Sequence, residues 1–127
     1  MTVKILQFGT TGQLATELTR QAATHDVALT ALSRADCDLA DPAACARAVA
    51  SHRPDLVIIA AAYTAVDLAE TERDLARTVN ALAPAAIAGA CQAAGAALVN
   101  VSTDYVFDGA GGAPYAEEAE PHPLNVY

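Results

Sequence analysis

The chain has 127 residues, 54% of them hydrophobic and 17% charged, a composition that indicates a folded globular domain and argues against a disordered one. A chain of this size buries enough surface for one core and not for two. Its formal net charge of −8 argues against nucleic acid or an anionic membrane surface as the main partner.

Localisation is suggested by the apolar runs and the cysteines. Charged residues, proline or glycine interrupt each apolar run before it reaches the length of a membrane span, and the first residues lack a signal-peptide pattern. Cys37, Cys45 and Cys91 are odd in number and lack metal-ligand spacing, which favours reduced thiols over a structural zinc or a disulfide framework. We therefore expect a soluble cytoplasmic protein without a metal site.

Four apolar segments alternate with segments of helical spacing. Val3–Phe8 is short and β-leaning, and Gly9 ends it. Asp41-Pro42 is a strong helix start, with an N-cap carboxylate followed by proline at the first helical position. We expect strands at 3–8, 27–32, 56–62 and 96–101, and helices at 14–23, at 43–51, within 67–79 and at 80–94.

This order predicts a Rossmann-type, doubly wound α/β fold with an incomplete parallel sheet of about four strands, at about 30 residues per βα unit. The third and fourth strands are apolar enough to be buried on both faces. The 80–94 helix is apolar nearly all round, so we expect it to be sandwiched between other elements. Pro84 should kink it or mark its first turn.

The segment Gly9-Thr10-Thr11-Gly12-Gln13-Leu14 lies between the first strand and the first helix. Glycines at this place let the backbone approach a pyrophosphate, and the helix N-terminus adds free N–H groups and a positive dipole end. The motif therefore predicts a dinucleotide site, because a βαβ unit surrounds it.

The end of the second strand bears on the choice between NAD and NADP. Ser33 and Arg34 stand there, and no carboxylate follows until Asp36, which favours NADPH over NADH. Arg34 as a solvated surface residue is an equal alternative. Asp38 and Leu39 are placed to meet an adenine edge. The alanines at 60–62 suit a backbone lying against a cofactor, or plain tight packing.

Polar residues follow the fourth strand at once, in the run Ser102-Thr103-Asp104. Ligands of an open parallel sheet bind outside the carboxyl ends of its strands, so these hydroxyls and this carboxylate are placed to touch a substrate. A strand with an ordinary polar turn is the alternative. Tyr127 lies downstream, where a further helix is expected to start.

Five segments together resemble one family: the glycine turn, and residues 61–70, 79–81, 102–109 and 123–127. The most specific are Ala-Ala-Tyr-Thr-Ala-Val-Asp and Ser-Thr-Asp-Tyr-Val-Phe-Asp-Gly. With these, the chain resembles the dTDP-4-dehydrorhamnose reductases of the extended short-chain dehydrogenase/reductase superfamily. Two departures stand out: Ile59 and Ala15 occupy positions where that family often has Asn and Gly.

The resemblance implies NAD(P)H-dependent reduction of the C4 keto group of dTDP-4-dehydro-β-L-rhamnose to dTDP-L-rhamnose. It implies that Tyr127 protonates the developing alkoxide, that Thr103 hydrogen-bonds the same oxygen and that Asp104 lines the pocket. The implied cofactor-binding residues are Gly9, Thr10, Thr11, Gly12, Gln13, Leu14, Ser33, Arg34, Asp38, Leu39, Ala60, Ala61, Ala62, Tyr63 and Thr64.

A free phenol has a pKa of about 10, so a nearby cation is needed to bring it toward neutral pH. In the family this cation is a lysine four residues after the tyrosine, and this sequence stops at Tyr127. We therefore expect residues 1–127 to be the N-terminal portion of an NAD(P)-binding Rossmann domain, without the sugar-nucleotide part. Alone it should have little activity, marginal stability and a tendency to associate through its exposed last strand.

Two other functions stay open. A non-catalytic regulatory subunit of the methionine adenosyltransferase type resembles these reductases. The other open function is that of a sugar-nucleotide epimerase or dehydratase of the same superfamily, although such enzymes usually have a different sequence motif after the fourth strand. The resemblance also leaves open a homodimer and Mg²⁺, for which the sequence offers no assignable site.

Overall fold

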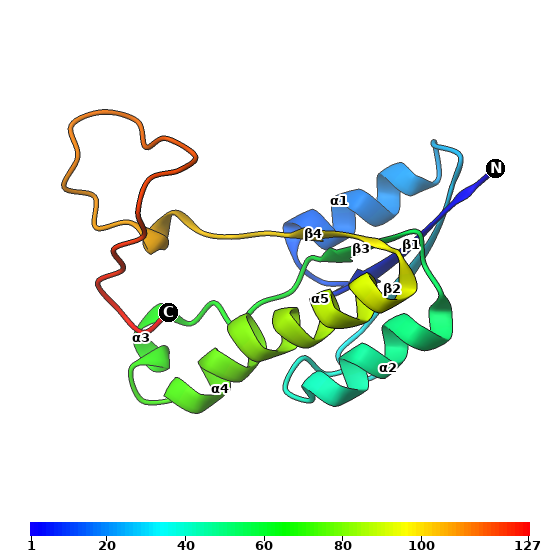
Figure 1. Ribbon diagram of the computed structural model, residues 1–127, viewed down its shortest axis with the longest axis horizontal. Coiled ribbons are helices and arrows are strands. Elements are labelled where there is room, and N and C mark those ends of the chain that lie inside the picture. Colours follow the sequence, from blue (N-terminus) through cyan, green and yellow to red (C-terminus); the bar gives the residue numbers. More distant parts are fainter.

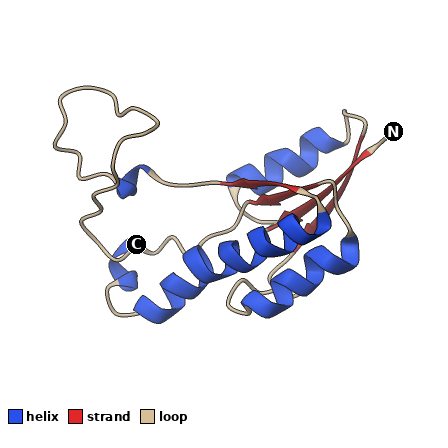
Figure 2. Cartoon of the chain, in the orientation of Figure 1, coloured by secondary structure: helices blue, strands red, loops and turns tan.

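In the computed structural model, which describes residues 1–127, four parallel strands form one sheet (Figure 2). The strands are β1 (Val3–Phe8), β2 (Val27–Leu32), β3 (Leu56–Ile59) and β4 (Ala97–Asn100), in the spatial order β2-β1-β3-β4. Every neighbouring pair is parallel, so each connection crosses over the sheet through a helix. The predicted Rossmann-type α/β fold is confirmed.

Helices cover both faces of this sheet. One face carries α1 (Gln13–Ala22), and the other carries α2 (Pro42–His52) and α5 (Ala83–Ala94) side by side (Figure 1). Two short helices, α3 (Val66–Ala69) and α4 (Arg73–Arg77), and a π turn at Thr78–Leu82 lead into α5, and a 3₁₀ turn at Asp104–Val106 follows β4. None of the helices has the length and apolarity needed to cross a membrane.

The main core lies between the sheet and the α2/α5 layer. Alternate residues of the central strands point into it, because side chains of a strand alternate between its faces. β1 contributes Leu6 and Phe8, which are both 1% exposed, and α5 contributes Ile87, which is fully buried. The remaining buried members are Leu32, Leu39, Cys45, Val49, Val57, Ile59, Ala83 and Cys91.

The predicted start of α2 and the predicted end of α5 are confirmed. The Asp41 carboxylate accepts a hydrogen bond from the Ala44 N–H at 3.0 Å, and Pro42 occupies the first turn. Such a cap satisfies one of the N–H groups that a helix start leaves without a partner. At the end of α5, Gly95 has a φ of 71°, a left-handed conformation that glycine adopts without steric penalty.

The third strand is shorter than the predicted 56–62. It ends at Ile59, and the last bond to β1 runs from the Ala60 N–H to the Phe8 carbonyl at 2.9 Å. β1 itself stops at Phe8 because Gly9 turns away, so the following alanines have no strand to pair with. They leave the sheet and line the cavities described below.

The predicted helix at 80–94 also differs from the structure. The α-helix begins at Ala83, and the Ala83 N–H donates to the Thr78 carbonyl in the preceding π turn. Pro84 has no N–H to donate to the Asn80 carbonyl, which explains why the backbone widens there. Pro84 thus both interrupts the regular helix and stands in the first turn of α5.

The prediction that this helix is sandwiched is wrong. Only one face of α5 is buried, through Ala83, Ile87 and Cys91, while Ala88 and Gln92 are exposed. Alanine is the strongest helix former, so the apolar composition of α5 reflects helix propensity as well as burial.

β4 is likewise not a strand buried on both faces. Its Val99 is 47% exposed, and Val101 just beyond it is 54% exposed. β4 is an edge strand, paired only with β3, and α1 lies over the β1–β2 side of that face. The third strand, in contrast, is buried on both faces as predicted, with Ile58 8% exposed on the face opposite Val57.

Truncation of the α5 core contact tests this packing. Ile87→Ala should lower the free energy of unfolding by about 2–5 kcal/mol, because the large buried side chain leaves a cavity. Gln92→Ala, on the exposed face of the same helix, should change it by less than about 0.5 kcal/mol. Urea unfolding of both variants measures the difference, and equal effects would contradict the described burial of α5.

Candidate functional site

Two cavities lie along the carboxyl ends of the strands. The larger has a volume of about 600 Å³ and is bordered by the ends of β1 and β2. The smaller, of about 400 Å³, is bordered by the ends of β3 and β4. Both are lined by Ala61, Ala62 and Val79, so they adjoin at this segment. Together they extend across the carboxyl edge of the sheet, where open α/β sheets bind their ligands.

The glycine turn begins at Gly9, whose φ of 106° lies in a region that other residues rarely adopt. A Cβ at Gly9 would lie 2.8 Å from the Ala61 Cβ and 3.0 Å from the Ala60 carbonyl oxygen. Gly12 is the N-cap of α1, and no side chain caps this helix. The turn therefore approaches the β3 segment closely and leaves helix N–H groups free for an anion.

The side chain of Gln7, in β1, holds this turn in place. No sequence motif had pointed to this residue. Its side chain is fully buried, and its Nε2 donates to the carbonyls of Gly9 at 2.9 Å and of Ala15 at 3.1 Å. Its Oε1 has no partner. The Gln7 amide therefore links β1 to the turn and to α1, and these bonds restrain the backbone of the turn. A glutamine inside an apolar strand was the signal that could have identified it.

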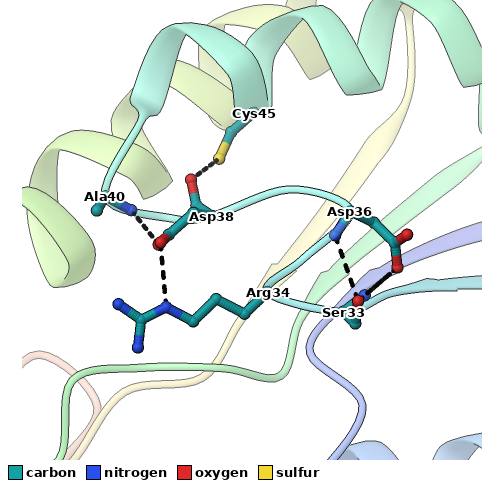
Figure 3. A network of polar contacts seen from close by, with 6 residues as sticks. All are labelled: Ser33, Arg34, Asp36, Asp38, Ala40 and Cys45. Atoms are coloured by element: carbon teal, nitrogen blue, oxygen red, sulfur yellow. Dashed lines mark hydrogen bonds and ion pairs between the residues drawn. The ribbon is translucent and has the colours of Figure 1, made fainter.

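The segment after β2 carries a polar network around two carboxylates, Asp36 and Asp38, of which Asp38 lines the larger cavity (Figure 3). The Asp36 carboxylate accepts from the Ser33 hydroxyl at 2.6 Å and from the Ser33 N–H at 2.8 Å, and these bonds lower its pKa. The Asp38 carboxylate accepts from the Ala40 N–H at 2.9 Å and from Nε of Arg34 at 3.0 Å. Both contacts lower the pKa of Asp38, the Ala40 bond most.

Arg34 is exposed to solvent and also borders the larger cavity, and its role toward a 2′-phosphate stays a prediction. Its side chain is 81% exposed, and it lines the rim of the larger cavity. Only its Nε is bonded within the protein, so its terminal nitrogens remain available to a phosphate.

Two thiols lie below this network. The Cys37 and Cys45 sulfurs are 3.6 Å apart, and Cys37 lines the larger cavity. Burial, and then the neighbouring Cys37, raises the pKa of Cys45 to about 12. Cys45 is therefore a protonated, small apolar group in the core.

The segment between the two cavities is held by Asn80, another residue without an assigned role in the sequence analysis. Its Oδ1 accepts from the Tyr63 N–H and its Nδ2 donates to the Tyr63 carbonyl, each at 2.9 Å. Asn80 stands in the π turn, so the irregular backbone before Pro84 carries the side chain that fixes this segment. The Val79-Asn80-Ala81 motif pointed to the position but not to this contact.

The Tyr63 side chain makes a hydrogen bond at the edge of the larger cavity. Its hydroxyl donates to the Glu72 carboxylate at 2.6 Å, and both residues line that cavity. Removal of the phenol from water, followed by the hydrogen bond to Glu72 and its negative charge, raises the pKa of Tyr63 to about 12. Tyr63 is therefore a neutral hydrogen-bond donor at physiological pH.

Thr103 and Tyr127 both line the smaller cavity. The Thr103 Oγ accepts from the Tyr105 N–H at 3.2 Å and lies 3.4 Å from the Asp104 Oδ1. The ring of Tyr127 packs edge-on against Tyr105, with 5.7 Å between centroids, and the Val126 N–H donates to the Glu70 Oε1 at 2.8 Å.

The cavities bring together every residue that the resemblance implied except Asp104, which lines neither. Asp104 reaches the site only through its contact with Thr103. The individual roles stay predictions. Gly9, Thr10, Thr11, Ser33, Arg34, Asp38, Leu39 and Tyr63 line the larger cavity, Gly12, Gln13, Leu14, Ala60, Thr64, Thr103 and Tyr127 line the smaller, and Ala61 and Ala62 line both.

A parallel sheet with a glycine turn after its first strand and a ligand-sized groove at its carboxyl edge defines a Rossmann-type α/β protein. The family described as "RmlD substrate binding domain" matches residues 3–127, and the chain belongs to this family. The resemblance found in the sequence is confirmed.

Curated relatives include the dTDP-4-dehydrorhamnose reductases of Streptomyces griseus, 49% identical over 94% of this chain and 39% of that protein, and of Salmonella typhimurium, 45% identical over 98% and 43%. The chain thus spans about two fifths of the length of these relatives.

Solved structures of the same name are also similar. The enzyme of Bacillus anthracis, in complex with NADP, has a TM-score of 0.93 at 36% identity, over all of this chain and 45% of that one. The enzyme of Clostridium acetobutylicum has a TM-score of 0.92 at 38% identity, over 98% and 44%. A UDP-glucose 4-epimerase of Thermus thermophilus, with a TM-score of 0.82 at 22% identity over 98% and 46%, shares the fold.

The Tyr63–Glu72 contact predicts a late phenol titration. Tyr63 should ionise near pH 12, above the ordinary tyrosine value of about 10. Because its pKa is higher in the folded than in the unfolded state, its contribution to stability is complete below about pH 10 and is lost as the pH rises through 12.

Ultraviolet titration measures this step. Glu72→Gln should bring the pKa of Tyr63 part of the way back toward 10, since the charge goes and the burial stays. Glu117→Gln in the exposed loop is the control. A late step that survives in Tyr63→Phe would show that another tyrosine produces it.

Proposed function

We propose that the polypeptide containing this domain uses NAD(P)H to reduce the C4 keto group of dTDP-4-dehydro-β-L-rhamnose, yielding dTDP-L-rhamnose. The observation that carries the proposal is that Thr103 and Tyr127 line a cavity that adjoins the cavity of the glycine turn. A hydride acceptor and a dinucleotide can therefore meet at the segment between them. Several curated relatives, at 41–49% identity, have this reductase name.

The residues present fit a nicotinamide dinucleotide. The larger cavity has the volume and mixed polar lining that suit an adenosine moiety. The turn between Gly9 and Gly12 presents backbone N–H groups and the uncapped start of α1 to a pyrophosphate. The smaller cavity, lined by Thr103 and Tyr127, would then hold the nicotinamide end. When bound, the reduced cofactor supplies the hydride.

Thr103 and Tyr127 act on the ketone oxygen in this proposal. The Thr103 Oγ already accepts from the Tyr105 N–H, which leaves its proton to donate, and that proton has only the 3.4 Å contact with Asp104 to compete. The Tyr127 hydroxyl can deliver a proton to the oxygen as negative charge develops there.

Further parts of the proposal concern the whole polypeptide. We infer that residues 1–127 supply the cofactor-binding part, that most contacts with the dTDP-sugar come from elsewhere in the polypeptide, and that it works in the cytoplasm, where thiols such as Cys37 stay reduced. Within residues 1–127, no three His, Cys, Asp or Glu side chains are grouped so as to hold a metal ion.

NADPH is the proposed cofactor of choice, supported by Arg34 at the rim of the larger cavity. Arg34→Ala should weaken NADPH binding by about tenfold to a hundredfold and leave NADH binding nearly unchanged, because a charged hydrogen bond to the 2′-phosphate contributes roughly 1.5–3 kcal/mol. Fluorescence titration of both cofactors at one salt concentration measures this. Equal losses, or a clear NADH preference of the unmodified protein, would contradict it.

The reaction itself is tested at Thr103. In the full-length polypeptide, Thr103→Val should lower turnover by roughly one or two orders of magnitude with cofactor affinity kept, because it removes one donor to the reacting oxygen. NADPH oxidation with the 4-keto sugar nucleotide is the assay, and stoichiometric consumption distinguishes a reductase from an epimerase. Unchanged turnover would remove Thr103 from the mechanism.

A further inference from the structure

The catalytic tyrosine of the proposed reaction is attached to the rest of the fold by a contact that spans 56 residues. The Glu70 Oε1 accepts a hydrogen bond from the Val126 N–H at 2.8 Å, one residue before Tyr127. Figure 1 shows the C-terminus lying beside α3, the helix that Glu70 follows. We propose that Glu70 is a positioning residue for Tyr127; this inference rests on the proposed function.

Glu70 is itself held in place. Its N–H donates to the Asp67 carbonyl at 3.2 Å, and the preceding Ala69 is fully buried. Arg73 donates through Nε to the Glu70 carbonyl at 3.1 Å and contacts the Glu70 Oε2 at 3.4 Å. One carboxylate oxygen therefore faces Arg73, and the other is left for Val126.

The segment that carries Tyr127 has no regular structure to hold it. Residues 120–127 belong to no helix or strand, and the closest preceding backbone anchor is the His122 N–H, which donates to the Val106 carbonyl at 2.7 Å. The ring of Tyr127 contacts Tyr105 edge-on. That contact restrains the ring, whereas the Glu70 bond restrains the backbone from which the ring projects.

A bond from an N–H to a carboxylate is stronger than one between neutral groups. It also satisfies a backbone donor where a helix is expected to start, the place at which a negative charge is favourable. Without Glu70 the phenol should still reach the smaller cavity, but in more positions. Displacement of a reacting group by about 1 Å can lower turnover by roughly a hundredfold.

The test uses the full-length polypeptide with NADPH and the 4-keto sugar nucleotide. Glu70→Ala should lower kcat by about tenfold to a hundredfold and leave NADPH affinity within about twofold. Glu70→Gln should restore much of the rate, because its side-chain oxygen can still accept the Val126 N–H. Rates equal to the unmodified protein in Glu70→Ala, or no recovery in Glu70→Gln, would overturn the proposal.

One control variant separates the Glu70–Val126 bond from the loss of a surface charge. Glu17→Ala breaks an exposed ion pair with Arg20 at the same three-residue spacing as Glu70 and Arg73, without a long-range contact. It should keep kcat, and a loss equal to that of Glu70→Ala would contradict a role through Val126.

Two readouts distinguish positioning from general damage. In a Tyr127→Phe background, Glu70→Ala should add less than about twofold to the loss, because both changes act on the same group. Amide hydrogen exchange at Val126 should become about tenfold or more faster in Glu70→Ala. Unchanged exchange would refute the Glu70–Val126 bond, even if the reductase activity is absent. Absent activity together with faster exchange would refute only the proposed function.

Discussion

The close approach of Gly9 to the end of β3 is the constraint on which the site depends. The space for a side chain at Gly9 is already taken by Ala60 and Ala61, with the nearest atom 2.8 Å from a would-be Cβ. At the same point, the Gly9 N–H donates to the Leu32 carbonyl and the Ala60 N–H donates to the Phe8 carbonyl, each at 2.9 Å. Three strands therefore end together, and both cavities open where they end.

The surrounding structure turns this junction into a two-part site. Asn80 bonds both the N–H and the carbonyl of Tyr63, the residue that follows the alanine segment lining both cavities. Gln7 holds the turn from inside the sheet, and Glu70 holds the segment of Tyr127 from outside. Each of these contacts joins a side-chain amide or carboxylate to a backbone group.

Much of the fold could be predicted because local rules determine it. Short, apolar, β-leaning runs and the residues that end them located β1 and β2 to the residue, and Asp41-Pro42 located the start of α2. The rest depends on tertiary partners. The end of β3 follows from where β1 stops, and the exposed face of α5 from what lies beside it. Motif spacing located the lining residues of the cavities, but no local pattern indicates that Glu70 contacts Val126.

The most direct test of the account is the binding of NADPH to the unmodified protein and to Gly9→Ala, with Gly89→Ala as the control. Gly89 lies in α5 with no atom within 4 Å of a would-be Cβ, so alanine there should leave affinity unchanged. Gly9→Ala should weaken binding at least about tenfold, since it strains the left-handed turn and pushes the turn away from the β3 segment. Equal affinity in all three proteins would contradict the claim that the two cavities form one dinucleotide site around this turn.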